Sequence, residues 1–220
     1  MSPSGESQTL SPCRVCRASA LSLFAVIDEK TYWRCATCHA TLLDEAHFLA
    51  ALGERARYET HQNDASDGRY RTFLDRLAAP LIARMPPAQQ GLDYGCGPGP
   101  LLAMMLTEAG HTVKLWDPFF HRDERALEGT YDFITCTEVF EHFHQPRVEF
   151  ARLGSLLRPG GLLAVMTTLQ TDDARFEQWY YRRDPTHVTF YREFTMRFVA
   201  AQHGWTCETP AENVVLFRKG

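Results

Sequence analysis

Four cysteines near the amino terminus have the residue type and the spacing of a metal site. Cys13 and Cys16 form one CxxC pair, Cys35 and Cys38 form another, and 18 residues separate the two pairs. Each CxxC turn places two thiolates on one side of the backbone, and two such turns complete the tetrahedron that zinc prefers. Zinc would also supply folding free energy that so short a module cannot obtain from a hydrophobic core. The sequence therefore predicts a structural zinc ribbon over residues 13–43, with free thiols or a degenerate site as the alternative.

A glycine-rich loop in the middle of the chain has the composition of a ligand cradle. It reads LDYGCGPG from Leu92 on, so its glycines are Gly95, Gly97 and Gly99. Glycines let a backbone turn tightly and approach a ligand closely. Asp93 precedes the first glycine by two residues, where an acid can meet a cationic or hydroxylic ligand. Pro98 removes a backbone donor, which suits the pyrophosphate of a dinucleotide less well.

One acid follows the next apolar stretch, HTVKLW, and has the position of a ribose ligand. Asp117 directly follows that stretch, where its carboxylate can bind both hydroxyls of a ribose. The alternative is a turn aspartate that precedes Pro118. The register between Asp117 and the glycine loop favours the ribose interpretation.

Further polar side chains follow the apolar stretch YDFITCT, at a point where an open α/β sheet presents its ligand crevice. The candidates there are Thr137, Glu138, Glu141 and His142. Glu138 and Glu141 would share one face of a helix that began at once, with His142 beside them. The alternative is a helix N-terminus that favours acids through its dipole. We expect Thr137 and Glu138 to border a bound cofactor, and Glu138 and His142 to border the reacting groups.

Histidines elsewhere in the chain offer proton-transfer groups. His187 stands in the segment DPTHVTFY, which can arch over a crevice as a lid, and imidazole titrates near neutrality. It could act as the base for a hydroxyl or an amine, or it could be a histidine hydrogen-bonded inside the lid. Tyr58 and His61 form a second polar segment, for which an exposed helix end is the alternative. A metal site formed by His142 and His144 is disfavoured, because residues two apart on a helix do not face one another.

The elements that must position these side chains alternate in type after residue 90. Short apolar stretches predict strands near 91–95, 111–117, 131–137 and 161–167, with two more near the carboxyl terminus. Helical patterns stand between them, including one expected from about Glu138, and a long helix is expected from Asp44. This alternation predicts an α/β fold of the Rossmann-like class, with a doubly wound and mostly parallel sheet.

The whole chain divides into four predicted segments. These are a disordered tail (1–12), the zinc ribbon (13–43), a helical connector or cap (44–90) and the α/β domain (91–220). The 220 residues include 23 Lys and Arg against 27 Asp and Glu, and the net charge of −4 argues against a nucleic-acid or membrane-surface binder. No apolar run approaches the roughly 20 residues of a membrane span, and paired CxxC cysteines favour a reducing cytoplasm. The polar first residues do not resemble a secretory signal.

Four motifs, in this order, resemble class I S-adenosylmethionine-dependent methyltransferases. They are DYGCGPG, VKLWD, YDFITCTEVFEH and LLRPGGLLAVMT, and the resemblance covers about residues 91–220. The chain also resembles bacterial methyltransferase-domain proteins with an N-terminal cysteine ribbon, through segments 56–64 and 184–191. The resemblance implies transfer of a sulfonium methyl group to a nucleophile. It further implies that the methionine part of S-adenosylmethionine borders Asp93, Gly95, Gly97 and Gly99, and that the ribose borders Asp117.

The sequence departs from the family after Asp117. Only 13 residues separate Asp117 from Tyr131, where family members usually fit a helix, a strand and another turn. We therefore expect the strand beyond Asp117 to be missing or rudimentary, which would shorten the sheet at its edge. The adenine would then lean on Phe119, Phe120 or the strand end at 135–137.

The sequence thus predicts a methyltransferase that acts on a small-molecule acceptor, with S-adenosylmethionine and structural Zn²⁺ as cofactors. His187 or His61 would take the proton of a hydroxyl or amine acceptor. One alternative is an RNA or protein methyltransferase docked by the ribbon, although the acidic balance makes nucleic acid an improbable partner. Another is a cofactor-binding or assembly protein without catalysis, suggested by the shortened segment after Asp117.

Overall fold

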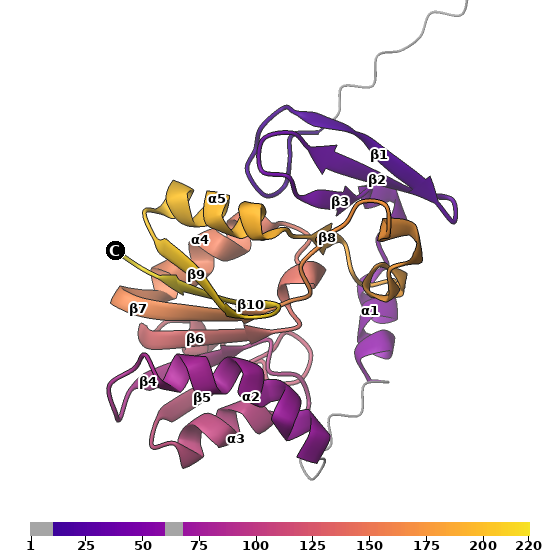
Figure 1. The fold of residues 1–220 in the computed structure, drawn as a ribbon. Coiled ribbons are helices and arrows are strands. Elements are labelled where there is room, and N and C mark those ends of the chain that lie inside the picture. Colours follow the sequence, from indigo (N-terminus) through magenta and orange to yellow (C-terminus); the bar gives the residue numbers. More distant parts are fainter. Residues whose placement is uncertain (1–10, 60–67) are drawn as a thin grey trace, which may run out of the picture.

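A six-stranded sheet forms the centre of the computed structural model, which describes residues 11–59 and 68–220 (Figure 1). The strand order is β5-β4-β6-β7-β10-β9. Strands β5, β4, β6 and β7 are parallel, whereas β10 pairs antiparallel with both β7 and β9. Their bounds are β4 (Gln90–Tyr94), β5 (Thr112–Trp116), β6 (Tyr131–Thr137), β7 (Leu157–Met166), β9 (Thr206–Ala211) and β10 (Val214–Arg218).

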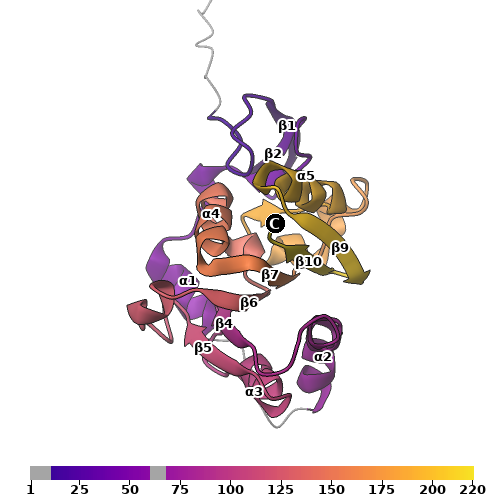
Figure 2. The same ribbon diagram turned by 90° about the vertical axis from the view of Figure 1, so that its left-hand side faces the viewer.

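Helices cover both faces of this sheet, as Figures 1 and 2 show. On one face α2 (Gly68–Ile82) and α3 (Leu101–Glu108) pack on side chains such as Phe133 of β6. On the other face α4 (Pro146–Leu156) and α5 (Glu193–His203) pack on Ile134 and its neighbours. Adjacent strand residues point to opposite faces, so a strand buried on both faces is apolar throughout. The predicted α/β, Rossmann-like fold is confirmed.

The segment between β5 and β6 contains no further strand, as expected from the 13 residues that separate Asp117 from Tyr131. It holds a 3₁₀ turn at Glu124–Leu127, and β5 forms the edge of the sheet. The strand expected to be missing after Asp117 is therefore absent from this described segment.

Two predicted helices are wrong in their bounds. The helix expected from Asp44 begins at Ala51, as α1 (Ala51–Tyr58), and Asp44 instead caps a 3₁₀ turn at Glu45–His47. The helix expected near Glu138 begins at Pro146, after a 3₁₀ turn at Phe140–His142. Glu138 has a φ of +53°, in the left-handed region, and a residue in that conformation cannot start an α-helix.

A second sheet joins the cysteine-rich segment to the rest of the chain. Its order is β1-β2-β3-β8, with β1 (Leu21–Ile27), β2 (Lys30–Cys35), β3 (Thr41–Leu43) and β8 (Thr189–Phe190). The hairpin β1–β2 is the one predicted, but β8 comes from the segment after β7. Thr41 pairs with Phe190, so the ribbon is held to the segment that carries His187.

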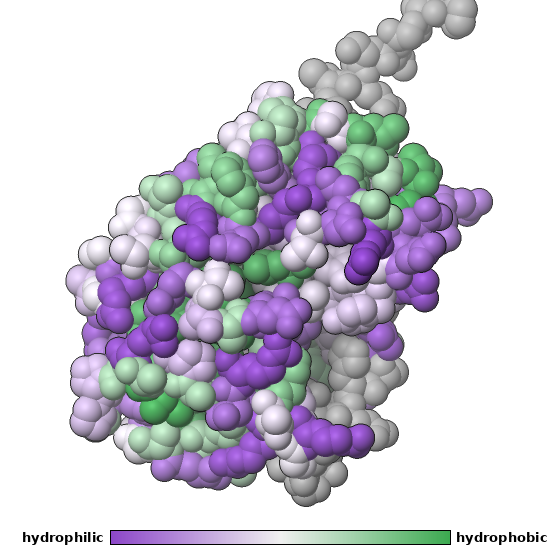
Figure 3. Space-filling view, in the orientation of Figure 1, coloured by the Kyte–Doolittle hydropathy of each residue, from purple (hydrophilic) through white to green (hydrophobic). Residues whose placement is uncertain are grey.

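The face of the protein drawn in Figure 3 mixes hydrophilic and hydrophobic residues. Exposed Leu23 and Val26 both lie on β1 of the ribbon. In the part of the chain that the structure describes, no helix is long and apolar enough to cross a membrane.

Candidate functional site

A cavity of about 800 Å³ opens at the carboxyl ends of β4, β5 and β6. This edge of an open α/β sheet is where ligands bind in the fold class. The glycine loop, the turn after Asp117 and the turn after Thr137 form its floor, and Tyr58 and the segment that includes Tyr181 and His187 form its other wall. Sequence-predicted residues from both ends of the site therefore line one space.

The glycine loop connects β4 to α3 and is fixed to the end of β5. The amides of Gly95 and Cys96 donate to the carbonyl of Trp116, at 2.8 and 3.3 Å. Gly95 and Gly97 have φ values of +78° and +64°, a region that favours glycine. A Cβ atom on Gly95 would lie 2.5 Å from Cγ2 of Val139, so the close approach of the two segments also requires glycine.

Asp117 ties this loop to the turn that follows β5. Its Oδ2 accepts from the Gly97 amide at 3.0 Å, and its Oδ1 accepts from the amides of Phe119 and Phe120 at 2.8 and 3.0 Å. The carboxylate is 7% exposed and lines the cavity together with Gly97 and Gly99. The turn-aspartate alternative thus describes part of what Asp117 does. Its role toward a ribose remains a prediction, and Oδ2, which accepts only one hydrogen bond from the described residues, retains acceptor capacity for it.

Asp93 is a buried carboxyl group at the floor of the same cavity. It is 4% exposed, and its Oδ1 accepts a hydrogen bond from Oγ1 of Thr135 at 2.7 Å. Burial raises the pKa of Asp93 to about 6, although the Thr135 hydrogen bond opposes this shift. A cationic ligand group next to Asp93 would stabilise its ionised form.

Two buried polar atoms beside the cavity have no hydrogen-bond partner among the described residues. They are Oγ1 of Thr137 and Nε1 of Trp116. Buried polar groups are normally paired, so these atoms are suited to a polar ligand. Together with the glycine cradle, Asp93 and the rings of Phe119 and Phe120, they fit a ligand that combines an ammonium group, a ribose and an aromatic base.

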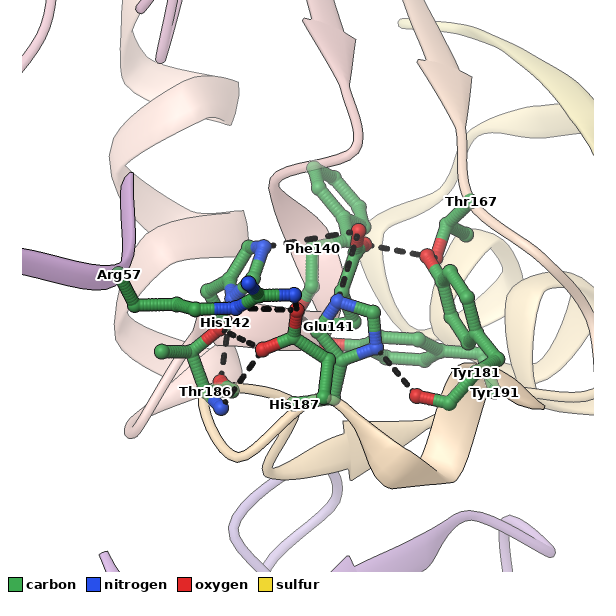
Figure 4. Close-up of polar contacts among 10 residues, drawn as sticks. Arg57, Phe140, Glu141, His142, Thr167, Tyr181, Thr186, His187 and Tyr191 are labelled. Carbon is green, nitrogen blue, oxygen red and sulfur yellow. Dashed lines mark hydrogen bonds and ion pairs between the residues drawn. The ribbon is translucent and has the colours of Figure 1, made fainter. Parts of the chain in front are cut away.

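A second polar cluster lies beside the cavity, where the turn after β6 meets the segment before β8 (Figure 4). The Glu141 carboxylate is 0% exposed, and its Oε2 accepts from Oγ1 of Thr167 at 2.8 Å. Its Oε1 lies 3.8 Å from Nε2 of His142 and 4.0 Å from Nε2 of His187. Figure 4 shows the two imidazole rings next to each other, with a nitrogen of each near this carboxylate, one ring from the turn after β6 and one from the segment before β8.

Backbone carbonyl groups orient both rings. Nδ1 of His142 donates to the Thr186 carbonyl at 3.1 Å, and Nδ1 of His187 donates to the Tyr181 carbonyl at 2.7 Å. A carbonyl only accepts, so Nδ1 carries the proton and Nε2 of a neutral ring presents its lone pair toward Glu141. Burial lowers the pKa of His187, which favours the neutral ring, while the Glu141 charge opposes this shift.

Glu138 borders the cavity between the two halves of the site. Burial raises its pKa to about 9, and the nearby charge of Glu141 adds to this shift. The predicted pairing of Glu138 and Glu141 on a helix face is wrong in its geometry, because a 3₁₀ turn replaces the helix. The predicted proximity of Glu138, Glu141 and His142 is nevertheless present.

Some of the predicted and observed site residues do not coincide. His61 lies outside the residues that the structure describes. The sequence analysis missed Thr167, at the end of β7, although the end of a parallel strand is itself a signal. It also missed Arg57 and Asp184, which form an ion pair at 2.7 Å between α1 and the segment before His187.

The four ribbon cysteines converge as their spacing predicts. The Sγ atoms of Cys13 and Cys38 lie 3.6 Å apart, as do those of Cys16 and Cys35. Zinc–sulfur bonds of about 2.3 Å in a tetrahedron place sulfur atoms about 3.8 Å apart, so the four thiols fit zinc closely. Their ligand atoms all lie within 4.8 Å of one another. Four thiolates would hold a structural ion and leave no open coordination position.

The sheet order and the cavity at the carboxyl ends of its strands define a Rossmann-like α/β protein with a ligand site above the glycine loop. Residues 61–209 match the model of the methyltransferase domain family. The chain therefore belongs to that family, which confirms the resemblance seen in its motifs.

Curated relatives and solved structures place the chain among methyltransferases. It is 31% identical over 85 residues to the ubiquinone biosynthesis O-methyltransferase of Pectobacterium atrosepticum, a match that covers 39% of this chain and 35% of that protein. The match thus spans about a third of the relative's length.

Two solved structures share the fold at lower identity. An O-methyltransferase family protein from Burkholderia thailandensis gives a TM-score of 0.56 at 18% identity, over 75% of this chain and 61% of that one. The 1,6-didemethyltoxoflavin-N1-methyltransferase of the same organism, solved with its namesake compound and S-adenosylhomocysteine, gives 0.52 at 17% identity, over 91% and 99% of the two chains.

Proposed function

We propose that the protein transfers the methyl group of S-adenosylmethionine to a hydroxyl group of a small-molecule acceptor. The observation that carries this proposal is one cavity that is lined by the glycine loop, by Asp93 and Asp117, and by His142 and His187, whose rings lie next to Glu141. The O-methyltransferase relatives and the family membership support the reaction type.

The floor of the cavity would hold the cofactor. The ammonium group of the methionine part would meet Asp93, next to Gly95, Gly97 and Gly99, and the ribose would meet Asp117. Thr137 and Glu138 border the space between the cofactor and the acceptor. When bound, S-adenosylmethionine supplies an electrophilic methyl group on a sulfonium centre.

The part of the cavity lined by His142 and His187 would hold the acceptor. Methyl transfer needs in-line geometry, exclusion of water and, for a hydroxyl nucleophile, removal of a proton. His187 and His142 both line the cavity, and burial lowers the pKa of His187 and so favours its neutral ring, which keeps His187 as the proposed base among the described residues. Glu141 would stabilise an imidazolium ring that forms beside it.

A small acceptor suits this site better than a macromolecule. The described wall that includes Tyr58, Tyr181 and His187 covers the cavity, and Arg57 and Asp184 fasten that wall by their ion pair. The net charge of −4 gives the chain no general attraction for RNA. We assign the ribbon a structural role, with zinc on Cys13, Cys16, Cys35 and Cys38.

Transfer of a labelled methyl group tests the proposal. The purified protein would be incubated with labelled S-adenosylmethionine and with separate small-molecule, RNA and protein fractions of a cell extract. We expect label in hydroxyl-containing small molecules, and its loss in Asp117→Asn but not in Asp123→Asn, which alters an exposed aspartate in the next turn. Label confined to RNA or protein would overturn the small-molecule acceptor. Absence of label from every fraction, despite cofactor binding, would favour a non-catalytic protein.

A further inference from the structure

Three side chains at the acceptor end of the cavity have the geometry of metal ligands. Glu141, His142 and His187 each offer one ligand atom, and these atoms lie within 4.8 Å of one another. Two histidines and one carboxylate are a frequent ligand set for divalent transition-metal ions. We propose that Glu141 Oε1, His142 Nε2 and His187 Nε2 bind such an ion, and that the acceptor hydroxyl completes its coordination. The second half of this statement rests on the proposed function, whereas the first half does not.

One oxygen of the Glu141 carboxylate has no hydrogen-bond partner among the described residues. Its Oε1 is buried and accepts no hydrogen bond from a described residue, while Oε2 is satisfied by Thr167. An incompletely paired carboxylate in a buried position is costly, because the lost hydration is not replaced. A metal ion between Oε1 and the two imidazole rings would replace it.

Both histidines are oriented in the manner of metal ligands. A ligating histidine normally donates its other ring N–H to a carbonyl or a carboxylate, which fixes the tautomer and the ring plane. Here the Nδ1 groups donate to the carbonyls of Thr186 and Tyr181, so both Nε2 atoms are left for an ion. A histidine that served only to pack in the wall would not need its free nitrogen directed at a buried carboxylate.

The three ligands are held by elements on both sides of the cluster. The Val188 amide, next to His187, donates to the Glu141 carbonyl at 2.8 Å. The Tyr191 hydroxyl donates to the carbonyl of Phe140, next to Glu141, at 3.0 Å. Bonds of about 2.0–2.2 Å place tetrahedral ligand atoms about 3.4 Å apart. The observed 3.8 and 4.0 Å therefore need only a contraction of a few tenths of an ångström around the ion.

Three protein ligands leave coordination positions open, which distinguishes this site from the four-cysteine ribbon. His142 and His187 line the cavity, so the open positions face the space assigned to the acceptor. A divalent ion lowers the pKa of a bound oxygen and orients it. The hydroxyl proton would pass to water in the cavity, the acceptor oxygen would form the new bond to the methyl carbon, and the carbon–sulfur bond would break to leave a neutral thioether. In the metal-loaded protein the two histidines would act as ligands, and the cavity water would take the proton that is otherwise assigned to His187.

Manganese binding to the zinc-loaded full-length protein tests the site without any turnover. Mn²⁺ suits a carboxylate ligand such as Glu141, whereas thiolates select softer ions, so the zinc-loaded ribbon does not compete for it. Electron paramagnetic resonance measures free Mn²⁺ during a titration. We expect one saturable Mn²⁺ per chain, and at least a tenfold loss of affinity in Glu141→Gln and in His187→Ala.

His144→Gln provides a matched control, because His144 lies two residues from His142 but bonds to Glu54. This variant should bind Mn²⁺ as the wild type does, and the thermal unfolding of each variant shows whether it is folded. Glu141→Gln keeps the shape and the acceptor oxygen for Thr167, so its loss of affinity would report the charge. Saturable binding that Glu141→Gln leaves unchanged, or no saturable binding in the wild type, would overturn the proposal. Titration of the same samples with S-adenosylhomocysteine separates this failure from failure of the proposed function.

Discussion

At the scale of single residues, burial sets the protonation of the side chains around the cavity. Asp93, Glu138 and His187 are all buried, and burial shifts the pKa of each toward its neutral form. A neutral group can then change its charge when a ligand arrives. We infer that the buried ionisable groups of the site lower the stability of the ligand-free protein and favour ligand binding.

Asp93 gives a pH-dependent prediction. Its pKa of about 6 lies above the ordinary value of 3.8, so the fold is destabilised by its ionisation as pH rises from about 4 to 6 and above. A cationic ligand prefers the ionised form, so the affinity for S-adenosylhomocysteine should fall by up to about tenfold for each pH unit below 6. Asp93→Asn should bind weakly at every pH without this dependence, which calorimetry between pH 5 and 8 would check.

The same residue predicts an opposite effect on stability. Asp93→Asn removes a buried charge and keeps an oxygen that can accept from Thr135. At pH 7 the free protein should therefore become more stable, by on the order of 1–3 kcal/mol. Denaturant unfolding of both proteins measures this difference, and a destabilised variant would show that the Asp93 charge has a partner in the fold.

His187 gives a prediction about chemistry. His187→Ala removes the imidazole ring from the part of the cavity assigned to the acceptor. It leaves the residues of the glycine loop unchanged. We expect kcat to fall by about 10²- to 10⁴-fold, with unchanged affinity for S-adenosylhomocysteine. A variant with normal turnover would remove His187 from the reaction, whether as a base or as a metal ligand.

At the scale of elements, close approaches between loops and the sheet determine which positions tolerate change. Gly95→Ala would place a Cβ 2.5 Å from Val139 and would also strain a φ of +78°. Gly110→Ala strains a φ of +90° but meets no atom within 4 Å. The second change should cost about 1–2 kcal/mol, whereas the first should cost more and also abolish cofactor binding. Thermal unfolding would measure the stability of the two variants, and calorimetry would measure their affinity for the cofactor. Equal changes in Gly95→Ala and Gly110→Ala would show that the contact with Val139 is unimportant.

The ribbon and the acceptor wall form one continuous unit. Arg14, between the ribbon cysteines Cys13 and Cys16, donates to the carbonyls of Leu43 and Val188 at 3.0 and 3.1 Å, and β3 pairs with β8. The ribbon therefore supports the backbone next to His187. We therefore expect changes in the ribbon to affect the site, although the ribbon does not line the cavity floor.

Removal of zinc should consequently affect both stability and turnover. Cys38→Ser, or chelation of the ion, should lower stability by about 3 kcal/mol, which corresponds to a fall in Tm of about 6–12 °C. Turnover should fall as well, because the wall that carries His187 loses its support. Cys207→Ser, at a half-buried cysteine of β9, should change neither quantity. Normal turnover in a zinc-free protein would show that the ribbon does not support the site.

At the scale of the whole molecule, the fold could be predicted because its signals are local. Alternating strand and helix patterns after residue 90 predict the parallel sheet, and the short interval after Asp117 predicts its missing edge strand. The helix expected at Glu138 was wrong because a left-handed residue interrupts a sequence that otherwise suits a helix. Local composition does not indicate a backbone conformation that contacts from another segment impose.

The parts of the site that sequence could not predict depend on distant pairings. His142 and His187 stand 45 residues apart, and the Glu141 carboxylate that joins them is buried by a turn rather than by a helix. The addition of β8 to the ribbon sheet joins residues about 150 positions apart. Each of these features follows from the path of the chain over the sheet, which no single motif encodes.

The central claim is that the cavity at the strand ends binds the methyl donor. Calorimetric titration of the zinc-loaded protein with S-adenosylhomocysteine tests it most directly. The account predicts one site per chain, with binding weaker by about 1–3 kcal/mol in Asp117→Asn and unchanged in Asp123→Asn. Absence of saturable binding in a folded wild-type protein would contradict the account, because the shortened segment after Asp117 would then have removed the cofactor site.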